Sequence, residues 1–365
     1  MEVEQALAEG IHTTSPTCHV DCIPIADGGE GMLEVMMNLS EGQQKEVEVH
    51  DALMRPIHAQ YGLLDKGLTA VIEMAKASGL PLLKENERNP LLTSSYGTGE
   101  LIRDALQQGC KKILIGIGGS ATNDGGMGML QALGVRFYDT EGHILPIGCG
   151  NLLGKVNDID IHPLQTLLKN VTITVACDVD NPLCGPKGAT AVFAPQKGAS
   201  TEALILMEEG MQWYARQIKK VTGRNISRLP GAGAAGGVGG ALAAFLDARL
   251  LPGIELILEA VKFKERIQGA DLIITGEGKA DSQTLHGKVP AGVLHQAQEA
   301  QIPVVLVAGS IEDTEALNQA GFTAALSITP GILTVEQAMR PEAAKRNLSH
   351  TATQITRLIE LSEKK

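Results

Sequence analysis

The chain has 365 residues, which is enough for about two domains of ordinary size. Its 44% hydrophobic and 20% charged residues allow a sizeable core and exclude a disordered chain. The net charge of -11, with no basic run and only 3% aromatic residues, excludes nucleic acid or an anionic membrane as the main partner.

The first ten residues, MEVEQALAEG, lack the basic-then-apolar order of a signal peptide. No apolar segment reaches the ~18 residues that a membrane span needs. Six cysteines are scattered without a C-x-x-C pair, so the sequence indicates neither a zinc site nor a disulfide framework. We therefore expect a cytoplasmic protein with reduced thiols.

Hydrophobic periodicity and turn residues predict the elements in chain order. Helices are expected at 2–11, 32–39, 95–110, 125–133 and 335–361, and strands at 19–25, 45–51, 57–64, 111–117, 302–310 and 323–330. Strands that run into polar turns are expected at 171–183 and 272–284, while 68–80 fits a strand and a helix equally well. Strands that alternate with helices indicate α/β architecture with a parallel sheet.

Four of the apolar strands end in polar turns. The turns are IADGGEG (25–31), GIGGSATNDGG (116–126), CDVDNP (177–182) and TGEGKADSQ (275–283). Ligands of parallel sheets bind beyond the carboxyl ends of the strands, so these turns are the expected ligand site.

The turn at 116–124 fits the G-x-G-x-x-A pattern of dinucleotide folds, with Gly116, Gly118, Gly119 and Ser120 after a strand and before a helix. Its free backbone N–H groups would suit any phosphate. The alternative is a tight strand-to-helix turn in which the missing side chains only allow close packing. A second glycine run, with Gly233, Gly236 and Gly237, leaves the same two interpretations open.

Asp178, Asp180 and Asn181 lie within four residues at a strand end. Such side chains hold Mg²⁺ or orient a hydroxyl, but an Asx turn before a proline has the same composition. The segment 275–290 carries Glu277, Asp281 and Lys288. A carboxylate and an ammonium on one loop are what phosphoryl transfer requires, the first to deprotonate the attacking hydroxyl and the second to neutralise phosphoryl charge.

Five segments together resemble the bacterial glycerate kinase family of the first type. They are PIADGGEG (24–31), GIGGSATNDGG (116–126), ACDVDNPLCGPKGA (176–189), GAGAAGGVGGAL (231–242) and TGEGKADSQTLHGKVP (275–290). The resemblance implies transfer of the γ-phosphoryl of ATP to D-glycerate with Mg²⁺, at the 2-hydroxyl.

The resemblance also implies roles for individual residues. Asp281, Lys288 and Asp178 would be catalytic, and the glycines of both runs, Ser120 and Glu277 would bind ATP. Asp27, Asn123, Asp124 and Asn181 would contact glycerate, and Asp124 and Asp180 would hold the metal.

The fold that the resemblance implies is α/β: a flavodoxin-like parallel-sheet domain, residues 1–43 and 265–365, with a second α/β domain, 44–264, inserted in it. Family members begin with a strand and a loop carrying Asp, Ser and Lys that this sequence lacks, so an impaired, hydroxy-acid-binding protein is one alternative. The others are a glycerate kinase that gives 3-phosphoglycerate, and an NAD-dependent 2-hydroxy-acid dehydrogenase with Asp139 or Glu141 on the ribose.

Overall fold

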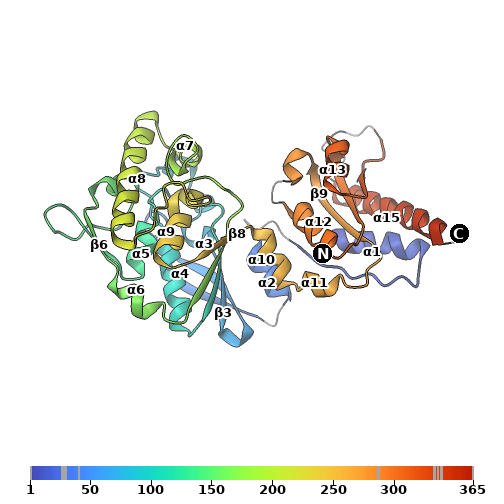
Figure 1. Cartoon of the computed structure of the whole chain (residues 1–365), viewed down its shortest axis with the longest axis horizontal. Helices are drawn as coiled ribbons and strands as arrows, with labels where there is room; N and C mark the ends of the chain where they lie inside the picture. Colours follow the sequence, from blue (N-terminus) through green and yellow to red (C-terminus); the bar gives the residue numbers. More distant parts are fainter. Residues whose placement is uncertain are drawn as a thin grey trace. The chain divides into compact units, whose positions relative to one another are not determined.

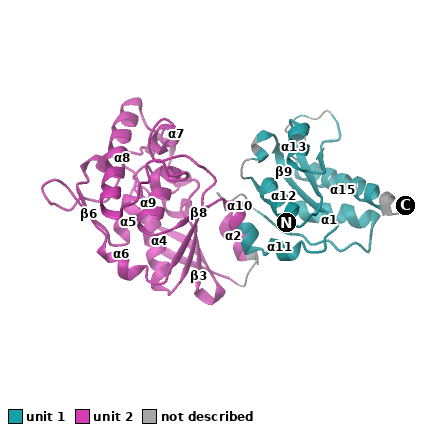
Figure 2. Cartoon of the chain, viewed as in Figure 1, with its two compact units in different colours: residues 1–26, 257–365 teal, residues 27–256 magenta. Residues whose placement is uncertain are grey.

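The computed structural model describes residues 2–25, 31–39, 42–285, 288–331, 334, 337 and 340–363. Two compact units divide the chain (Figure 2): Met1–Ala26 with Ile257–Lys365 form unit 1, and Asp27–Leu256 form unit 2. Unit 2 is therefore inserted between the two parts of unit 1. Both units are α/β, as the sequence predicts. No helix in the described ranges is long and apolar enough to cross a membrane.

Unit 1 is built on a three-stranded parallel sheet in the order β11-β10-β9. Its elements are α1 (Glu2–Thr14), α11 (Phe263–Arg266), β9 (Ile273–Ala280), α12 (Val289–Glu299), β10 (Val304–Ile311), α13 (Thr314–Ala320), β11 (Ala324–Ser327) and α15 (Pro341–Glu363). Helix α10 (Gly253–Ala260) begins in unit 2 and ends in unit 1.

Helices cover both faces of this sheet (Figure 1), because successive side chains of a strand point to opposite sides. Val304, Leu306 and Ala308 pack with residues of α12 and α13, and Val305 and Val307 pack with residues of α1 and α15. The two terminal helices α1 and α15 lie side by side. Gly10 permits this contact, since a Cβ there would lie 2.1 Å from the carbonyl oxygen of Ser349.

Unit 2 contains a six-stranded sheet in the order β1-β2-β3-β4-β7-β8. The first two pairings are antiparallel and the other three are parallel. The strands are β1 (Gln43–His50), β2 (Pro56–Leu64), β3 (Thr69–Glu73), β4 (Lys112–Gly116), β7 (Thr172–Ala176) and β8 (Arg249–Leu251), with β5 (Arg136–Tyr138) and β6 (Asp158–Asp160) in a separate pair.

The helices of unit 2 are α2 (Met32–Leu39), α3 (Ala75–Ser78), α4 (Tyr96–Gln107), α5 (Met127–Ala132), α6 (His162–Leu167), α7 (Ala189–Phe193), α8 (Thr201–Thr222) and α9 (Val238–Phe245). Helix α2 packs on β2 and β3, and the backbone N–H of Leu33 donates to Glu73. It therefore lies in unit 2, whereas the domain boundary expected after residue 43 would put it in unit 1.

Most of the expected elements are confirmed, and the segment 68–80 proves to be a strand followed by a short helix. The strand expected at 19–25 is wrong. Residues 18–25 form no ladder, Pro24 has no N–H to donate, and the segment is fastened by its side chains instead. Asp21 accepts a hydrogen bond from Arg266 Nε at 2.8 Å, and this bond lowers the pKa of the Asp21 carboxyl.

Candidate functional site

The candidate residues of unit 1 gather at the carboxyl end of β9. Glu277 Oε2 lies 3.3 Å from Lys288 Nζ, and Glu277 Oε1 accepts a hydrogen bond from the Thr284 hydroxyl. Glu277 is on the strand and Lys288 immediately precedes α12, so the strand-to-helix connection brings the two together. Both side chains remain partly exposed, at 15% and 34%. A carboxylate and an ammonium therefore share one accessible site.

Asp281 is joined to the same group through Thr284. Its backbone N–H donates to Thr284 Oγ1 at 2.9 Å, and its carboxylate lies 3.7 Å from Lys279 Nζ. The prediction that a polar turn begins at Thr275 is wrong, because β9 continues to Ala280. Glu277 and Lys279 are thus held by the ladder with β10 rather than by a loop.

The candidate residues of unit 2 lie at the carboxyl edge of its sheet. Strand β1 is antiparallel to β2, which is antiparallel to β3, so β1 ends at the same edge as the parallel strands. Gly116 ends β4, and the following turn pairs with the end of α3, where Leu80 N–H donates to the Gly119 carbonyl at 2.7 Å. Gly119 is exposed and has a φ of +68°, which favours glycine.

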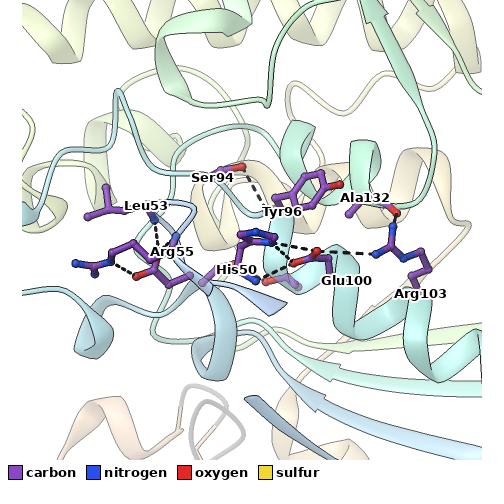
Figure 3. A network of polar contacts seen from close by, with 11 residues as sticks. His50, Leu53, Arg55, Ser94, Tyr96, Glu100, Arg103 and Ala132 are labelled. Carbon is purple, nitrogen blue, oxygen red and sulfur yellow. Dashed lines mark hydrogen bonds and ion pairs between the residues drawn. The ribbon is translucent and has the colours of Figure 1, made fainter. Parts of the chain in front are cut away.

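Figure 3 shows how the end of β1 is fixed at this edge. Glu100 of α4 accepts from the backbone N–H of His50 at 2.8 Å and lies 3.1 Å from the ring Nδ1. The ring of Tyr96 meets that of His50 edge-on, with centroids 6.1 Å apart. The carboxylate therefore holds α4 against β1.

Lys197 is a buried lysine at this turn that the sequence analysis did not identify. It comes from the 3-10 turn Pro195–Lys197, and its Nζ donates to Ser120 Oγ at 2.8 Å and to the Thr122 carbonyl at 2.7 Å. The residue is only 2% exposed. Burial lowers the pKa of Lys197 to about 7, although the charge of Asp124 opposes the shift.

Asp124 has a structural role in addition to its expected contacts with metal and substrate, which remain predictions. It is fully buried, and its carboxylate accepts hydrogen bonds from the N–H and hydroxyl of Ser95 and from the N–H groups of Gly126 and Gly128. Burial raises the pKa of this carboxyl, and the hydrogen bonds oppose the rise. The carboxylate therefore joins the beginnings of α4 and α5.

The amide of Asn123 is also fully buried. Its Nδ2 donates to Thr190 Oγ1 at 3.1 Å, while its Oδ1 has no hydrogen-bond partner in the described structure. The hydroxyl of the preceding residue, Thr122, is likewise buried without a partner among the described residues. Two polar atoms next to Lys197 thus have bonding capacity that this chain does not use.

The glycines at 233–237 pack against backbone, which favours the close-packing interpretation of this run over phosphate binding. A Cβ on Gly233 would lie 2.2 Å from the Pro182 carbonyl oxygen, one on Gly236 2.0 Å from that of Thr122, and one on Gly237 2.8 Å from the Cα of Gly125. All three glycines are buried. The missing side chains make room for neighbouring chain segments.

Side chains of the turn after β7 form hydrogen bonds with backbone groups of this chain. Asp178 Oδ1 accepts from the N–H of Gly253 at 2.7 Å and so caps α10, and Asn181 Nδ2 donates to the Lys187 carbonyl at 2.8 Å. Asp180 is exposed. Asp178 and Asn181 therefore have structural contacts in addition to any part in catalysis, and Asp27 lies outside the described residues.

Of the two residues expected to hold Mg²⁺, Asp180 is exposed and Asp124 is buried. The oxygens of Asp124 are engaged in four hydrogen bonds to protein groups. In the part of the chain that the structure describes, no group of three or more His, Cys, Asp or Glu side chains is placed to hold a metal ion.

The dinucleotide interpretation of 116–121 fails on topology. It requires the acidic residue to end the next parallel strand of the same sheet. Asp139 instead follows β5, which pairs antiparallel with β6 in a separate sheet. The Asp139 carboxylate closes the turn by accepting from the N–H groups of Glu141 and His143.

The chain is similar to known proteins over nearly its whole length. The model of the "Glycerate kinase family" matches residues 1–360. The chain is 45% identical to the glycerate kinase of Bacillus subtilis (strain 168), covering 100% of this chain and 94% of the relative. It is 45% identical to the glycerate 2-kinase of Escherichia coli (strain K12), covering 96% and 93%. A crystal structure of a protein assigned as glycerate kinase 2 from Salmonella typhimurium LT2 superposes with a TM-score of 0.87 at 43% identity, covering 100% and 95%.

Proposed function

Because the chain belongs to the glycerate kinase family and is a phosphotransferase, we propose that it transfers the γ-phosphoryl of ATP to the 2-hydroxyl of D-glycerate, giving 2-phosphoglycerate. The observation that carries the choice of hydroxyl is the 45% identity, over 96% of this chain, to a relative named glycerate 2-kinase. The dehydrogenase and the binding-only alternatives receive no support from the relatives.

The residues at the end of β9 supply the chemistry that such a transfer needs. Asp281 accepts the proton of the attacking hydroxyl, because its side chain is 22% exposed beside the Glu277–Lys288 pair. Lys288 offsets the negative charge that develops on the phosphoryl oxygens. Glu277 holds the ammonium of Lys288 in place, and Thr284 fixes Glu277 and Asp281 relative to each other.

ATP as the donor follows from membership of a kinase family, and Mg²⁺ as cofactor is part of this proposal. Kinases bind Mg²⁺ largely through the phosphates of the nucleotide and water, with one or two protein carboxylates. Addition of EDTA is therefore expected to abolish turnover, and addition of MgCl2 to restore it. We place the reaction in the cytoplasm, in line with the six free cysteines.

A coupled assay of ADP release across small hydroxy acids tests the function. D-glycerate is expected to give the highest kcat/KM, and ³¹P NMR of the product distinguishes phosphorylation at the 2-hydroxyl from that at the 3-hydroxyl. Release of ADP with another hydroxy acid but not with D-glycerate would contradict the substrate. A product phosphorylated at the 3-hydroxyl would contradict only the position.

A further inference from the structure

The Lys197 side chain is almost completely buried, and among the described residues it forms no ion pair, although the charge of Asp124 attracts it. Its partners are a hydroxyl and a carbonyl, which are neutral acceptors. A buried lysine without a carboxylate is costly to charge, because burial disfavours the ionised form. Its presence at the carboxyl edge of the sheet therefore calls for a reason other than stability.

The hydrogen-bond arrangement leaves one position at Nζ unused. An ammonium has three N–H donors, whereas a neutral amine has two donors and a lone pair. Two acceptors, Ser120 Oγ and the Thr122 carbonyl, are present. Binding of an anion nearby would favour the charged form and use the third donor.

The surrounding hydroxyl groups suit an anion. Ser120 Oγ accepts from Lys197, so its own proton remains available, and the Thr122 hydroxyl is buried with no partner in the described chain. The turn is open to solvent at Gly119. Hydroxyl donors and an ammonium are the groups that bind carboxylate and phosphoryl oxygens.

We propose that the turn 119–122 and Lys197 form an anion site of the kinase, and that Lys197 takes up one proton from solvent when the anion binds. The inference rests on the proposed function, which supplies two anions: the carboxylate of glycerate and the phosphates of ATP. In this step the amine of Lys197 gains one proton from solvent, and the resulting ammonium pairs with the anion. Lys197 thus binds the anion with its third N–H donor and also holds Ser120 in place.

The other ionisable groups around Lys197 do not account for such an uptake. Asp124 accepts hydrogen bonds that oppose the rise of its pKa through burial, and its charge attracts the ammonium. Tyr214 on α8 has its pKa raised well above the ordinary value by burial, so it is neutral throughout.

Isothermal titration calorimetry in two buffers of different ionisation enthalpy measures the proton uptake. The site with a pKa of about 7 is mostly neutral at pH 8 and mostly charged at pH 6. We expect about 0.9 protons taken up per anion bound at pH 8 and about 0.1 at pH 6. D-glycerate, a non-hydrolysable ATP analogue and sulfate are titrated separately. D-glycerate and sulfate keep their charge at pH 8, and the proton change of the nucleotide itself is subtracted with the titration of a variant that lacks the lysine.

Lys197→Met removes the titrating group, and Lys45→Met serves as the matched control, because Lys45 lies in the same unit and pairs with Asp104. We expect the uptake to disappear in Lys197→Met and to persist in Lys45→Met. Ser120→Ala is expected to weaken binding of the anion by about tenfold, the loss of one hydrogen bond to a charged group. A melting curve of each variant establishes that it is folded.

The ligands separate the possible results. Uptake with glycerate assigns the site to the carboxylate, and uptake with the ATP analogue alone assigns it to phosphate; both support the proposal. Equal uptake in the wild type and Lys197→Met overturns it. Uptake with sulfate but no binding of glycerate or nucleotide would retain the anion site and reject the proposed function, so the two failures are distinguishable.

Discussion

Replacing Lys197 by Met is expected to change how the stability of unit 2 depends on pH. The folded chain lowers the pKa of this lysine from 10.5 to about 7, so between these values the unfolded state binds one more proton. The unfolding free energy of the wild type therefore rises with pH in that window, by about 1.4 kcal/mol per unit. Lys197→Met lacks this contribution.

The magnitude is large enough to measure. The shift corresponds to a cost of about 5 kcal/mol for burying the lysine at pH values below 7. Met removes this cost but leaves Ser120 Oγ and the Thr122 carbonyl without their donor, at about 1 kcal/mol each. The variant is thus expected to be more stable than the wild type by about 2–3 kcal/mol at low pH.

Urea unfolding followed by the fluorescence of Trp213 tests this prediction. Trp213 is the only tryptophan of the chain and lies on α8, so it reports on unit 2. The stability difference between variant and wild type should fall by about 3 kcal/mol from pH 7 to pH 9.5. Lys45→Met, which removes a lysine that is 28% exposed, should retain the slope of the wild type. The same slope in Lys197→Met would mean that Lys197 stays charged when buried, and the reasoning would be refuted.

Three further outcomes are expected. Asp281→Asn lowers kcat for ADP release by about 10²-fold or more if this carboxylate is the general base, and an unchanged kcat would remove it from that role. Gly236→Ala destabilises unit 2 by about 2–4 kcal/mol, because the new Cβ would meet the Thr122 carbonyl at 2.0 Å. The control Gly223→Ala, also at positive φ but with nothing within 4 Å of the new Cβ, costs about 1 kcal/mol. Equal melting shifts of the two variants would contradict the packing argument. Gly118→Val weakens binding of nucleotide or glycerate more than it lowers the melting temperature, since a β-branched side chain would block the approach of a ligand to the turn; an early-melting variant with normal affinity would show that Gly118 is structural.

Local pattern sufficed for the α/β class and for most of its elements. The apolar runs at 111–117 and 302–310 are strands of parallel sheets. Such strands are buried on both faces and therefore consist of consecutive apolar residues, which the sequence shows directly. The grouping of Glu277 with Lys288 was also predictable, because the two flank one strand-to-helix connection and are only 11 residues apart. The strand predicted at 19–25 was wrong, because a strand needs a neighbouring strand for its hydrogen bonds. Whether such a neighbour exists depends on residues elsewhere in the chain.

Tertiary structure alone decided what the polar and glycine residues of unit 2 do. Lys197 lies 77 residues from Ser120 and stands in an ordinary stretch, APQKGAS, so nothing in its surroundings in the sequence marks it. Asp124 and Gly236 were visible in their motifs, but burial determines whether a carboxylate meets protein N–H groups or a ligand, and whether a missing Cβ admits a phosphate or a neighbouring backbone. Desolvation and close approach depend on segments distant in the chain, and the residue type by itself carries no record of them.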